Sequence, residues 1–223
     1  YFVDSCNCHY FNMTVKLFYF HDPMCSWCWG FAPTWERLQA RLTQELEYSL
    51  NIEYILGGLA PDSDLPMPQE MQETLQSYWR RIETLLGTQF NYDFWTKCQP
   101  RRSTYPACRA VLAASQQNHE KHMIRAIQEA YYLRAMNPSD TSTLEQLARE
   151  LELNTEQFAR DLRSPETEQL LKQQIEQYRN LSANGFPSLV LAFDSELIPI
   201  AIDYQRDETM FAMIKDTLKE KLK

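Results

Sequence analysis

Two cysteines, Cys25 and Cys28, carry the clearest chemical signal in the sequence, with Ser26 and Trp27 between them. Two intervening residues allow the second sulfur to close a disulfide with the first, so the pair can serve as a reversible dithiol/disulfide couple. The same spacing also occurs as half of a zinc site, and it can mark two unreactive thiols in a core. The surrounding residues have to decide between these three interpretations.

A zinc site is the weaker interpretation because two further ligands are not available at a suitable place. No second pair of cysteines has the same spacing, and Cys6, Cys8 and His9 lie within residues 1–12, which we interpret as an upstream or non-native extension. We therefore expect no metal. We also expect Cys98 and Cys108 to remain separate thiols in a reducing compartment.

The elements around the pair predict a reactive thiolate at Cys25. Residues 14–20 are mostly β-branched or aromatic, which predicts a buried strand, and a helix containing Pro33 should run from about Cys25 to Tyr48. The start of a helix offers free N–H groups and the positive end of its dipole, and both favour a thiolate. Cys28 lies about one turn further in, so we expect it to stay protonated when reduced.

The rest of the chain predicts an α/β fold that is split by an inserted helical subdomain. Residues 50–56 alternate like a strand, and their distance from the first strand implies a parallel pair. Strand and helix patterns return near the end, as a helix at 165–180, strands at 188–193 and 197–202 around a turn at 194–195, and a helix at 207–221. We therefore assign residues 13–65 and 164–223 to one split domain.

Residues 66–163 show almost no strand pattern and predict the helical subdomain, which we expect to cover the active-site face. One long amphipathic stripe consists of Met71, Leu75, Tyr78, Ile82, Leu85 and Leu86. Further along, Ser142 and Glu145 have the spacing of a capping box at a helix start.

The composition limits the classes of partner. The chain has 223 residues, 22 of them basic and 30 acidic, which gives a net charge of −8. An acidic surface repels phosphate backbones, so we expect no nucleic acid as a partner, and no apolar run is long enough to predict a membrane span. The first residues lack the pattern of a signal peptide, which leads us to expect a cytoplasmic protein.

The motif around the cysteines reads Asp22-Pro23-Met24-Cys25-Ser26-Trp27-Cys28-Trp29-Gly30-Phe31-Ala32-Pro33. It resembles the DsbA-like, FrnE-type branch of the thioredoxin superfamily, a group of predicted disulfide isomerases. A second motif, Gly185-Phe186-Pro187-Ser188, is similar to the loop of that superfamily that contains a cis-proline and faces the cysteines. The resemblance covers about residues 14–220 and implies a thioredoxin-like fold with a helical insertion.

The resemblance also implies roles for individual residues. Cys25 would attack a substrate disulfide, and Cys28 would resolve the mixed disulfide that results. Phe186 and Pro187, joined by a cis peptide bond, would contact the substrate. No cofactor is implied beyond the Cys25–Cys28 couple itself, although glutathione is a candidate co-substrate.

Two departures from the superfamily pattern bear on the mechanism. Many members have a buried carboxylate six residues before the first cysteine, but Tyr19 stands there, so a proton relay would fall to His21 or Asp22. Strongly oxidising members have a histidine between the cysteines, where this chain has the neutral pair Ser26-Trp27. We therefore expect an intermediate potential suited to reduction or isomerisation.

Two further groups near the motifs are candidates for substrate binding. Trp27 and Trp29 could form an apolar rim, although core packing explains Trp29 equally well. Arg101 and Arg102 could bind an anion such as a glutathione carboxylate, although an exposed loop before a helix is the simpler interpretation.

Three functional hypotheses follow from these residues. The first is a thiol–disulfide oxidoreductase or isomerase that acts on protein or small-molecule disulfides, with thioredoxin or glutathione as its reductant. The second is a glutathione-dependent isomerase or transferase similar to kappa-class transferases and 2-hydroxychromene-2-carboxylate isomerases, which generally lack a complete pair of cysteines. The third is a partner-binding module without enzymatic activity.

Overall fold

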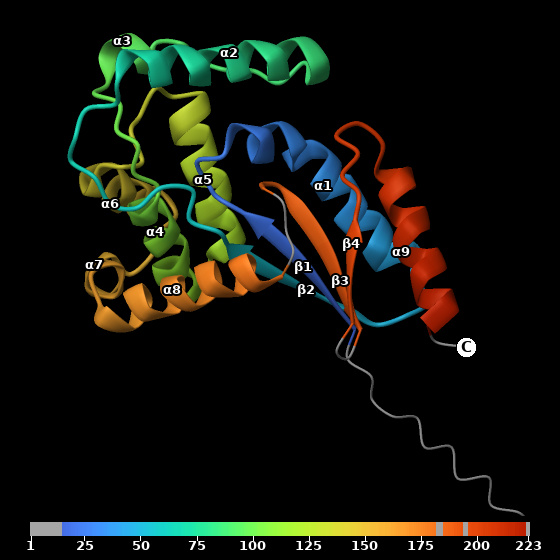
Figure 1. Ribbon diagram of the computed structural model, residues 1–223. Helices are drawn as coiled ribbons and strands as arrows, with labels where there is room; N and C mark the ends of the chain where they lie inside the picture. Colours follow the sequence, from blue (N-terminus) through green and yellow to red (C-terminus); the bar gives the residue numbers. More distant parts are fainter. Residues whose placement is uncertain (1–14, 182–184, 194–195, 222–223) are drawn as a thin grey trace, which may run out of the picture.

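The computed structural model describes residues 15–181, 185–193 and 196–221, and a four-stranded sheet lies at its centre (Figure 1). The strand order is β2-β1-β3-β4; β1 runs parallel to β2, whereas β3 runs antiparallel to both of its neighbours. The strands are β1 Val15–His21, β2 Leu50–Leu56, β3 Ser188–Phe193 and β4 Glu196–Ile200. The four predicted strands are thus confirmed within one or two residues, and the predicted turn at 194–195 lies outside the described residues.

The central strand β1 is apolar on both faces because both faces of the sheet are covered. Successive side chains of a strand point to opposite faces. Leu17 and Tyr19 belong to the core on one side, and Phe18 and Phe20 belong to the core on the other. This double burial explains why the sequence shows a continuous apolar run here and not an alternation.

Helices α1 (Ser26–Glu45) and α9 (Asp207–Lys221) cover the first face of the sheet, as Figure 1 shows. Both helices turn an apolar side toward the sheet, with Leu38 of α1 and Ile214 of α9 fully buried. The buried carboxylate of Asp207 joins them, since it accepts hydrogen bonds from Arg37 and Arg41 of α1. Helix α1 ends three residues before the predicted Tyr48.

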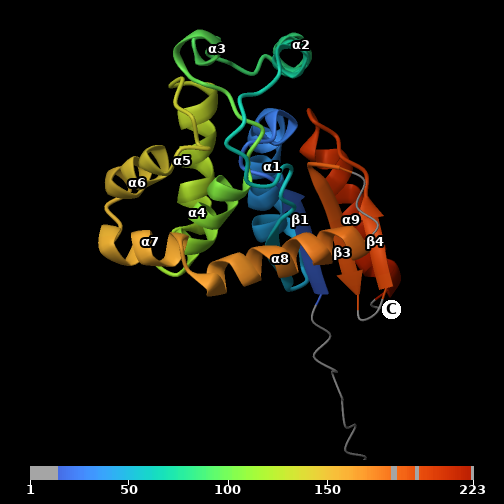
Figure 2. The same ribbon diagram turned by 60° about the vertical axis from the view of Figure 1, so that its left-hand side comes forward.

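Helix α8 (Pro165–Asn180) lies toward the opposite side of the sheet and links the sheet to the remaining helices (Figure 2). Tyr178 near its end packs with Phe20 and Phe186, and Gln174 accepts a hydrogen bond from the Leu56 N–H of β2 at 2.8 Å. Its N-cap is Ser164, whose hydroxyl accepts from the Thr167 N–H. The predicted bounds of 165–180 are confirmed.

Between β2 and α8 the chain forms helices around a separate core. That core includes Trp79, Met123, Leu144 and Phe158. The helices are α2 Gln69–Leu86, α3 Phe94–Lys97, α4 Tyr105–Ser115, α5 Glu120–Tyr132, α6 Thr141–Glu150 and α7 Thr155–Leu162. Within residues 66–163, all of them described, strand pairing is limited to a single bridge between Pro66 and Arg101. Helix α8 contacts β2 of the sheet and also α4 of the helical region. These contacts do not assign α8 to one side of a domain boundary, so the boundary expected at residue 164 stays a prediction.

Helix α2 differs from its prediction in which side chains it buries. Ile82 of the predicted stripe is fully buried, as expected, but Tyr78 and Leu85 of the same stripe are 42% and 49% exposed. The other buried residue of α2 is Trp79, which lies outside the stripe. Figure 1 shows the cause, because α2 extends along one edge of the molecule with few elements around it. An amphipathic stripe can therefore be only partly covered by the rest of the protein.

The capping box predicted at Ser142 and Glu145 is wrong. Helix α6 begins at Thr141 after Asp140, which makes no side-chain capping bond. The Asp140 carboxylate instead accepts from Arg101 at 2.6 Å, and Glu145 pairs with Arg163. Long-range ion pairs have replaced the local hydrogen bonds that the spacing predicted.

No helix among the described residues combines the length and the apolar character that crossing a lipid bilayer would require.

Candidate active site

Cys25 lies where β1 gives way to α1, at the N-cap position of that helix. Its sulfur accepts a hydrogen bond from the Cys28 N–H at 3.3 Å, one of the N–H groups that a helix start leaves unpaired. Cys25 has an exposed fraction of 6%. The local sequence therefore places a sulfur where backbone donors can stabilise negative charge.

Cys28 lies one turn into α1 and is fully buried. Burial raises the pKa of its thiol well above the ordinary value, and the hydrogen bond with Cys25 and the charge of Cys25 act in the same direction. The two cysteines are both free. The pair is therefore asymmetric, with Cys28 held as a thiol.

The loop before β3 approaches Cys25 from the far end of the sequence. The Phe186–Pro187 peptide bond is cis, as predicted, and the Cys25 thiol donates to the Phe186 carbonyl oxygen at 3.6 Å. Gly57 makes this approach possible, because a Cβ at that position would lie 1.8 Å from the Phe186 ring. Pro187 itself is buried, and Phe186 is the member of the pair that reaches the cleft.

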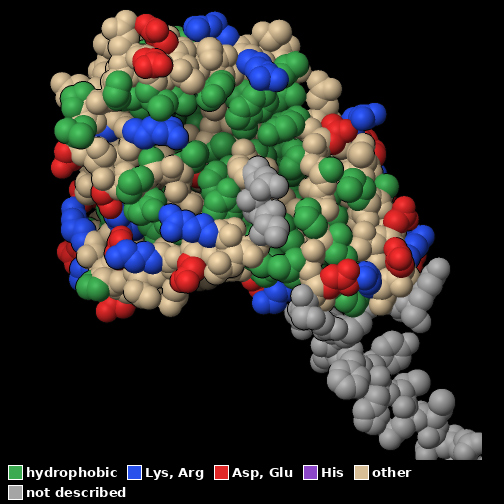
Figure 3. Space-filling model, viewed as in Figure 1, with side chains coloured by type: hydrophobic (Ala, Val, Ile, Leu, Met, Phe, Trp, Pro, Cys, Tyr) green, Lys and Arg blue, Asp and Glu red, His purple; other side chains and the backbone are tan. Residues whose placement is uncertain are grey.

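A cleft with a volume of about 310 Å³ opens beside Cys25. Figure 3 shows hydrophobic side chains gathered below α2, over the start of α1. The side chains from α2 that line the cleft include Leu75, Tyr78 and Trp79, so the inserted helices cover part of the site. The other lining residues are Met24, Cys25, Ser26, Trp27, Leu59, Met67, Arg101, Arg102, Thr104, Tyr131, Tyr178, Gly185 and Phe186.

The two tryptophans of the motif have different environments. Trp27 is half-buried, lines the cleft and lies beside Tyr204, as expected of a rim residue. Trp29 lies outside the cleft: it stacks on Tyr132, and its indole N–H donates to the Gln89 carbonyl oxygen at 3.1 Å. Trp29 thus packs in the core, which was the alternative to a place on the rim. It lies two residues after Trp27 on α1, so its side chain points away from the cleft.

Asp22 is fully buried and is the centre of a hydrogen-bond network. Its carboxylate accepts from the Met24 N–H at 2.8 Å, the Leu59 N–H at 2.7 Å, the Thr104 hydroxyl at 2.7 Å and the Cys108 thiol at 3.6 Å. Burial raises the pKa of this carboxyl, and the hydrogen bonds oppose that effect. The network joins the active-site turn to the loop after β2 and to α4.

The other residues considered for proton transfer are also buried. Neither ring nitrogen of His21 has a hydrogen-bond partner among the described residues, and burial lowers the pKa of His21 to about 3. The ring stacks between aromatic neighbours, with Tyr19 at a centroid distance of 5.1 Å. Burial raises the pKa of the Tyr19 phenol. The charge of Cys28 and a hydrogen bond between Tyr19 and Cys28 raise this pKa further. The phenol therefore lies beside the resolving thiol.

The remaining described cysteines are separate thiols, as expected. Cys98 donates to the Ala135 carbonyl oxygen at 3.0 Å, and Cys108 donates to Asp22. Cys6, Cys8 and His9 lie outside the described residues, so the zinc alternative that involves them stays untested.

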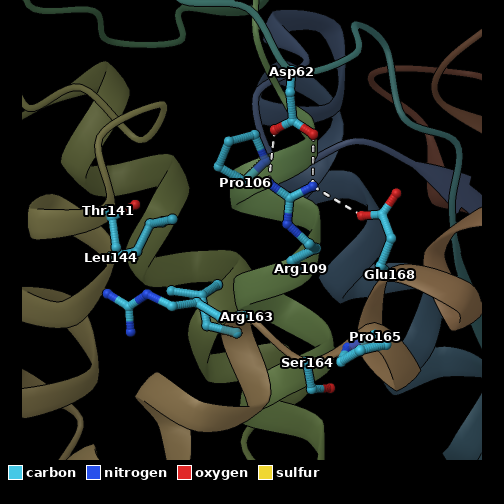
Figure 4. A pocket seen from close by; sticks show the side chains of 10 residues that line it. Asp62, Pro106, Arg109, Thr141, Leu144, Arg163, Ser164, Pro165 and Glu168 are labelled. Carbon is cyan, nitrogen blue, oxygen red and sulfur yellow. Dashed lines mark hydrogen bonds and ion pairs between the residues drawn. The ribbon is translucent and has the colours of Figure 1, made fainter.

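A second hollow, with a volume of about 430 Å³, lies among α4, α6, α7 and the start of α8 (Figure 4). It shares no lining residue with the cleft at Cys25. Its central group is Arg109, which makes two hydrogen bonds to Asp62 and one to Glu168. Its other arginine, Arg163, pairs with Glu145. These side chains neutralise one another, so the cleft at Cys25 is the better functional candidate.

Comparison with known proteins identifies the family. The family described as Thioredoxin matches residues 18–200. The chain belongs to this family. Solved structures of DsbA-like oxidoreductases share the fold of this chain, among them SCO1869 from Streptomyces coelicolor, which is 16% identical with a TM-score of 0.69.

Two solved structures are especially similar. A protein disulfide isomerase candidate from Nitrosomonas europaea is 26% identical with a TM-score of 0.79, over 93% of this chain and 98% of that chain. The cytosolic disulfide reductase DsbM from Pseudomonas aeruginosa is 24% identical with a TM-score of 0.72, over 92% and 99% of the two chains. DsbM has also been solved with GSH. At this identity the likeness to DsbM shows a shared fold.

The curated sequence relatives are named as adapter proteins, whereas the solved structures are named as disulfide reductases or isomerases. The ClpXP adapter protein SpxH of Halalkalibacterium halodurans is 24% identical over 81% of this chain and 60% of its own length. The protein of the same name from Bacillus subtilis is 23% identical, over 92% of this chain and 69% of its own length. The chain therefore spans about two thirds of the relatives it matches. Together with the structural neighbours, the family supports thiol–disulfide oxidoreductase chemistry in general.

Several features of the site had no usable signal in the sequence. Thr104 and Cys108 reach Asp22 from more than eighty residues away, and Gly57 makes room for Phe186 across the sheet. The pair Gly57-Gly58 after a strand hinted at a close approach, but it did not name the partner.

Proposed function

We propose that this chain is a thiol–disulfide oxidoreductase in which Cys25 attacks substrate disulfides and Cys28 resolves the intermediate. The observation that carries the proposal is the asymmetry of the pair. Cys25 caps α1 beside the cleft and accepts from a helix N–H, whereas Cys28 is fully buried and has a raised pKa. The Phe186 carbonyl oxygen beside Cys25 supports the proposal, because an extended substrate could pair with that backbone.

The reaction consists of two exchanges. The Cys25 thiolate attacks one sulfur of the substrate, a new S–S bond forms, and the other substrate sulfur leaves as a thiolate that takes a proton from solvent. Cys28, after losing its proton, attacks the Cys25 sulfur and releases the second half of the substrate. The substrate gains two electrons, and the protein ends with a Cys25–Cys28 disulfide. An external thiol or dithiol must then reduce that disulfide.

The proton on Cys28 needs an acceptor, and we assign this function to Asp22 in preference to His21. With a pKa lowered to about 3, His21 is a poor base. Asp22 can bind a proton more readily than an ordinary carboxyl because burial raises its pKa, and its charge also raises the pKa of Cys28. Asp22→Asn should shift the pH dependence of the second exchange, whereas His21→Phe should leave it unchanged.

The direction and the partners of the reaction belong to the same proposal. The neutral Ser26 and Trp27 between the cysteines offer no charge to stabilise the reduced pair strongly, so reduction or isomerisation of disulfides fits better than strong oxidation. Thioredoxin or glutathione would serve as reductant, in a cytoplasmic setting like that of the cytosolic neighbour DsbM. Glutathione as a co-substrate fits this scheme too, given that DsbM was solved with GSH.

Two alternatives are separated from this proposal by experiment. A glutathione-dependent transferase or isomerase would not need Cys28. A partner-binding module would need neither thiol; the name of the SpxH relatives, adapter protein, suggests such a function for those relatives. Insulin reduction and glutathione conjugation should be assayed side by side, with Cys28→Ser and with Cys98→Ser as a control thiol outside the pair. We expect insulin reduction that Cys28→Ser abolishes and Cys98→Ser retains. Conjugation that persists in Cys28→Ser, or no exchange by any form, would reject the proposal.

A further inference from the structure

The cleft at Cys25 has a charge opposite to that of the whole chain. The chain carries a net charge of −8, yet the residues that line the cleft include Arg101 and Arg102 and, among the described residues, no Asp or Glu. The rest of the lining is mainly aromatic or aliphatic. Arginine in an apolar surrounding interacts strongly with a carboxylate because little water is present to screen the pair.

The two arginines differ in how much of their charge is already neutralised. One guanidinium nitrogen of Arg101 donates to Asp140 at 2.6 Å and to the Ser139 carbonyl oxygen at 2.9 Å. Arg102 makes no hydrogen bond and no ion pair with the described part of the chain. Its charge lies close to the buried Tyr131, where it opposes the burial that raises the pKa of that phenol. Arg102 is therefore the cation that the cleft offers to a ligand.

The geometry points to Arg102 as a specificity-determining residue that binds a carboxylate of the substrate, which makes small disulfides of acidic thiols the substrate class of this site. This inference rests on the proposed function. The size of the cleft supports a small substrate, because about 310 Å³ lies at the lower end for small-molecule sites. The apolar lining would hold the carbon chain, while the carboxylate would bind Arg102 and a sulfur would meet Cys25.

Single-turnover exchange tests the inference without a separate reductant. The reduced protein is mixed with an excess of dithiodipropionate, which is anionic, bis(hydroxyethyl) disulfide, which is neutral, or cystamine, which is cationic. Acid quenching and mass spectrometry then measure formation of the Cys25–Cys28 disulfide. The ratio of variant to parent rate is taken for each compound, since that ratio cancels the intrinsic reactivity of each disulfide.

We expect Arg102→Gln to lower the rate with dithiodipropionate about tenfold, which corresponds to about 1.4 kcal/mol of lost binding. The rate with bis(hydroxyethyl) disulfide should change by less than about twofold, and the rate with cystamine should rise, because the repulsion between two cations is removed. The matched control is Arg160→Gln, which removes the same charge from the exposed end of α7. It should leave all three rates unchanged.

Two results would overturn the inference while leaving the proposed function in place. One is an equal effect of Arg102→Gln on all three compounds. The other is a loss of insulin reduction in Arg102→Gln with no loss for dithiodipropionate, which would assign Arg102 to protein substrates. If the parent protein exchanged with none of the three compounds and with no insulin disulfide, the proposed function itself would fail. Circular dichroism of each variant would show whether it has folded.

Discussion

The cleft at Cys25 and the hollow at Arg109 have similar sizes, and both contain arginine, yet they differ in how that charge is balanced. Arg109 binds both Asp62 and Glu168, and these contacts link the loop after β2 to α4 and α8 (Figure 4). In the cleft, Arg102 has no partner within the described residues, and the Cys25 sulfur lies at the start of α1. A hollow lined by paired charges stabilises the fold, whereas one with unpaired charge and a nucleophile is available to a ligand.

This difference also shows why volume alone does not identify a site. The volumes of the two hollows are about 430 Å³ at Arg109 and about 310 Å³ at Cys25, which does not distinguish them. The charged side chains at Arg109 already have partners inside the protein, so a charged ligand would have to break those contacts first. If the two regions have separate functions, substitutions in one should leave the properties of the other unchanged.

The largest effect should come from the sulfurs of the cleft. Cys25→Ser should lower the rate of disulfide exchange at least about a thousandfold, because a hydroxyl at the helix start does not ionise at neutral pH. Cys28→Ser should trap mixed disulfides at Cys25, and mass spectrometry of peptides would locate the adduct.

In the parent protein, iodoacetamide should alkylate Cys25 before Cys28, since Cys28 is fully buried and its pKa is raised. If Cys28 reacted first, the assigned roles would be wrong.

A smaller effect should follow from closing the space between β2 and the loop before β3. In Gly57→Ala the new Cβ would lie 1.8 Å from the Phe186 ring, so the ring must shift. We expect this shift to disturb the contact between the Phe186 carbonyl oxygen and Cys25. Overpacking of this kind costs about 2 kcal/mol, and we expect a similar loss in transition-state binding, about thirtyfold in exchange rate. Stopped-flow fluorescence would measure the rate. Gly87→Ala is the control: it adds a Cβ that meets no atom within 4 Å, although its positive φ makes a modest loss of stability expected there.

His21 tests whether every unpartnered polar group of this region is functional. We expect that it is not, and that His21 affects stability instead. The pKa of His21 is about 3 in the folded protein and about 6.5 in an unfolded chain. The unfolded state therefore binds the extra proton, and stability falls as the pH drops from about 6.5 toward 3.

Between pH 7 and pH 5 this linkage should cost about 2 kcal/mol. His21→Phe should remove that loss while it keeps the stacking on Tyr19. Urea unfolding of both proteins at the two pH values would measure the difference. An equal loss of stability in His21→Phe would mean that His21 is not the group responsible.

The smallest effect is expected in the paired hollow. Arg109→Met removes the contacts to Asp62 and Glu168, and since Asp62 is largely exposed we expect a loss of about 1 kcal/mol in the free energy of unfolding. The exchange rate at Cys25 should stay within about twofold of the parent rate. A large loss of exchange without loss of stability would mean that the two regions are not separate.

Much of the architecture could be predicted because it depends on local patterns. The apolar run of β1, the ends of α8 and α9 and the spacing of Cys25 and Cys28 all reflect contacts within a few residues. The cis bond at Pro187 followed from family resemblance and not from the physics of the sequence. Helix α3, only four residues long, was not predicted, because so short a helix gives no periodicity.

The errors concern positions where distant parts of the chain decide the environment. Periodicity predicted Tyr78 as inward-facing, but it is 42% exposed because that side of α2 lines the cleft at Cys25. The capping box at Ser142 did not form, since α6 begins one residue earlier, at Thr141, and its N-cap Asp140 pairs with the distant Arg101. Trp29 was a candidate for the rim until the structure placed it against Tyr132.

The sequence by itself determined the reactive pair, its place between a strand and a helix, and the order of strands and helices, since these depend on short-range spacing. Only the tertiary structure decided which buried group can accept a proton and which arginine is free. Both questions depend on hydrogen-bond partners from distant elements: Thr104 and Cys108 reach Asp22, and Asp140 reaches Arg101 but not Arg102. Burial and pairing set pKa and charge, and they exist only once the chain has folded.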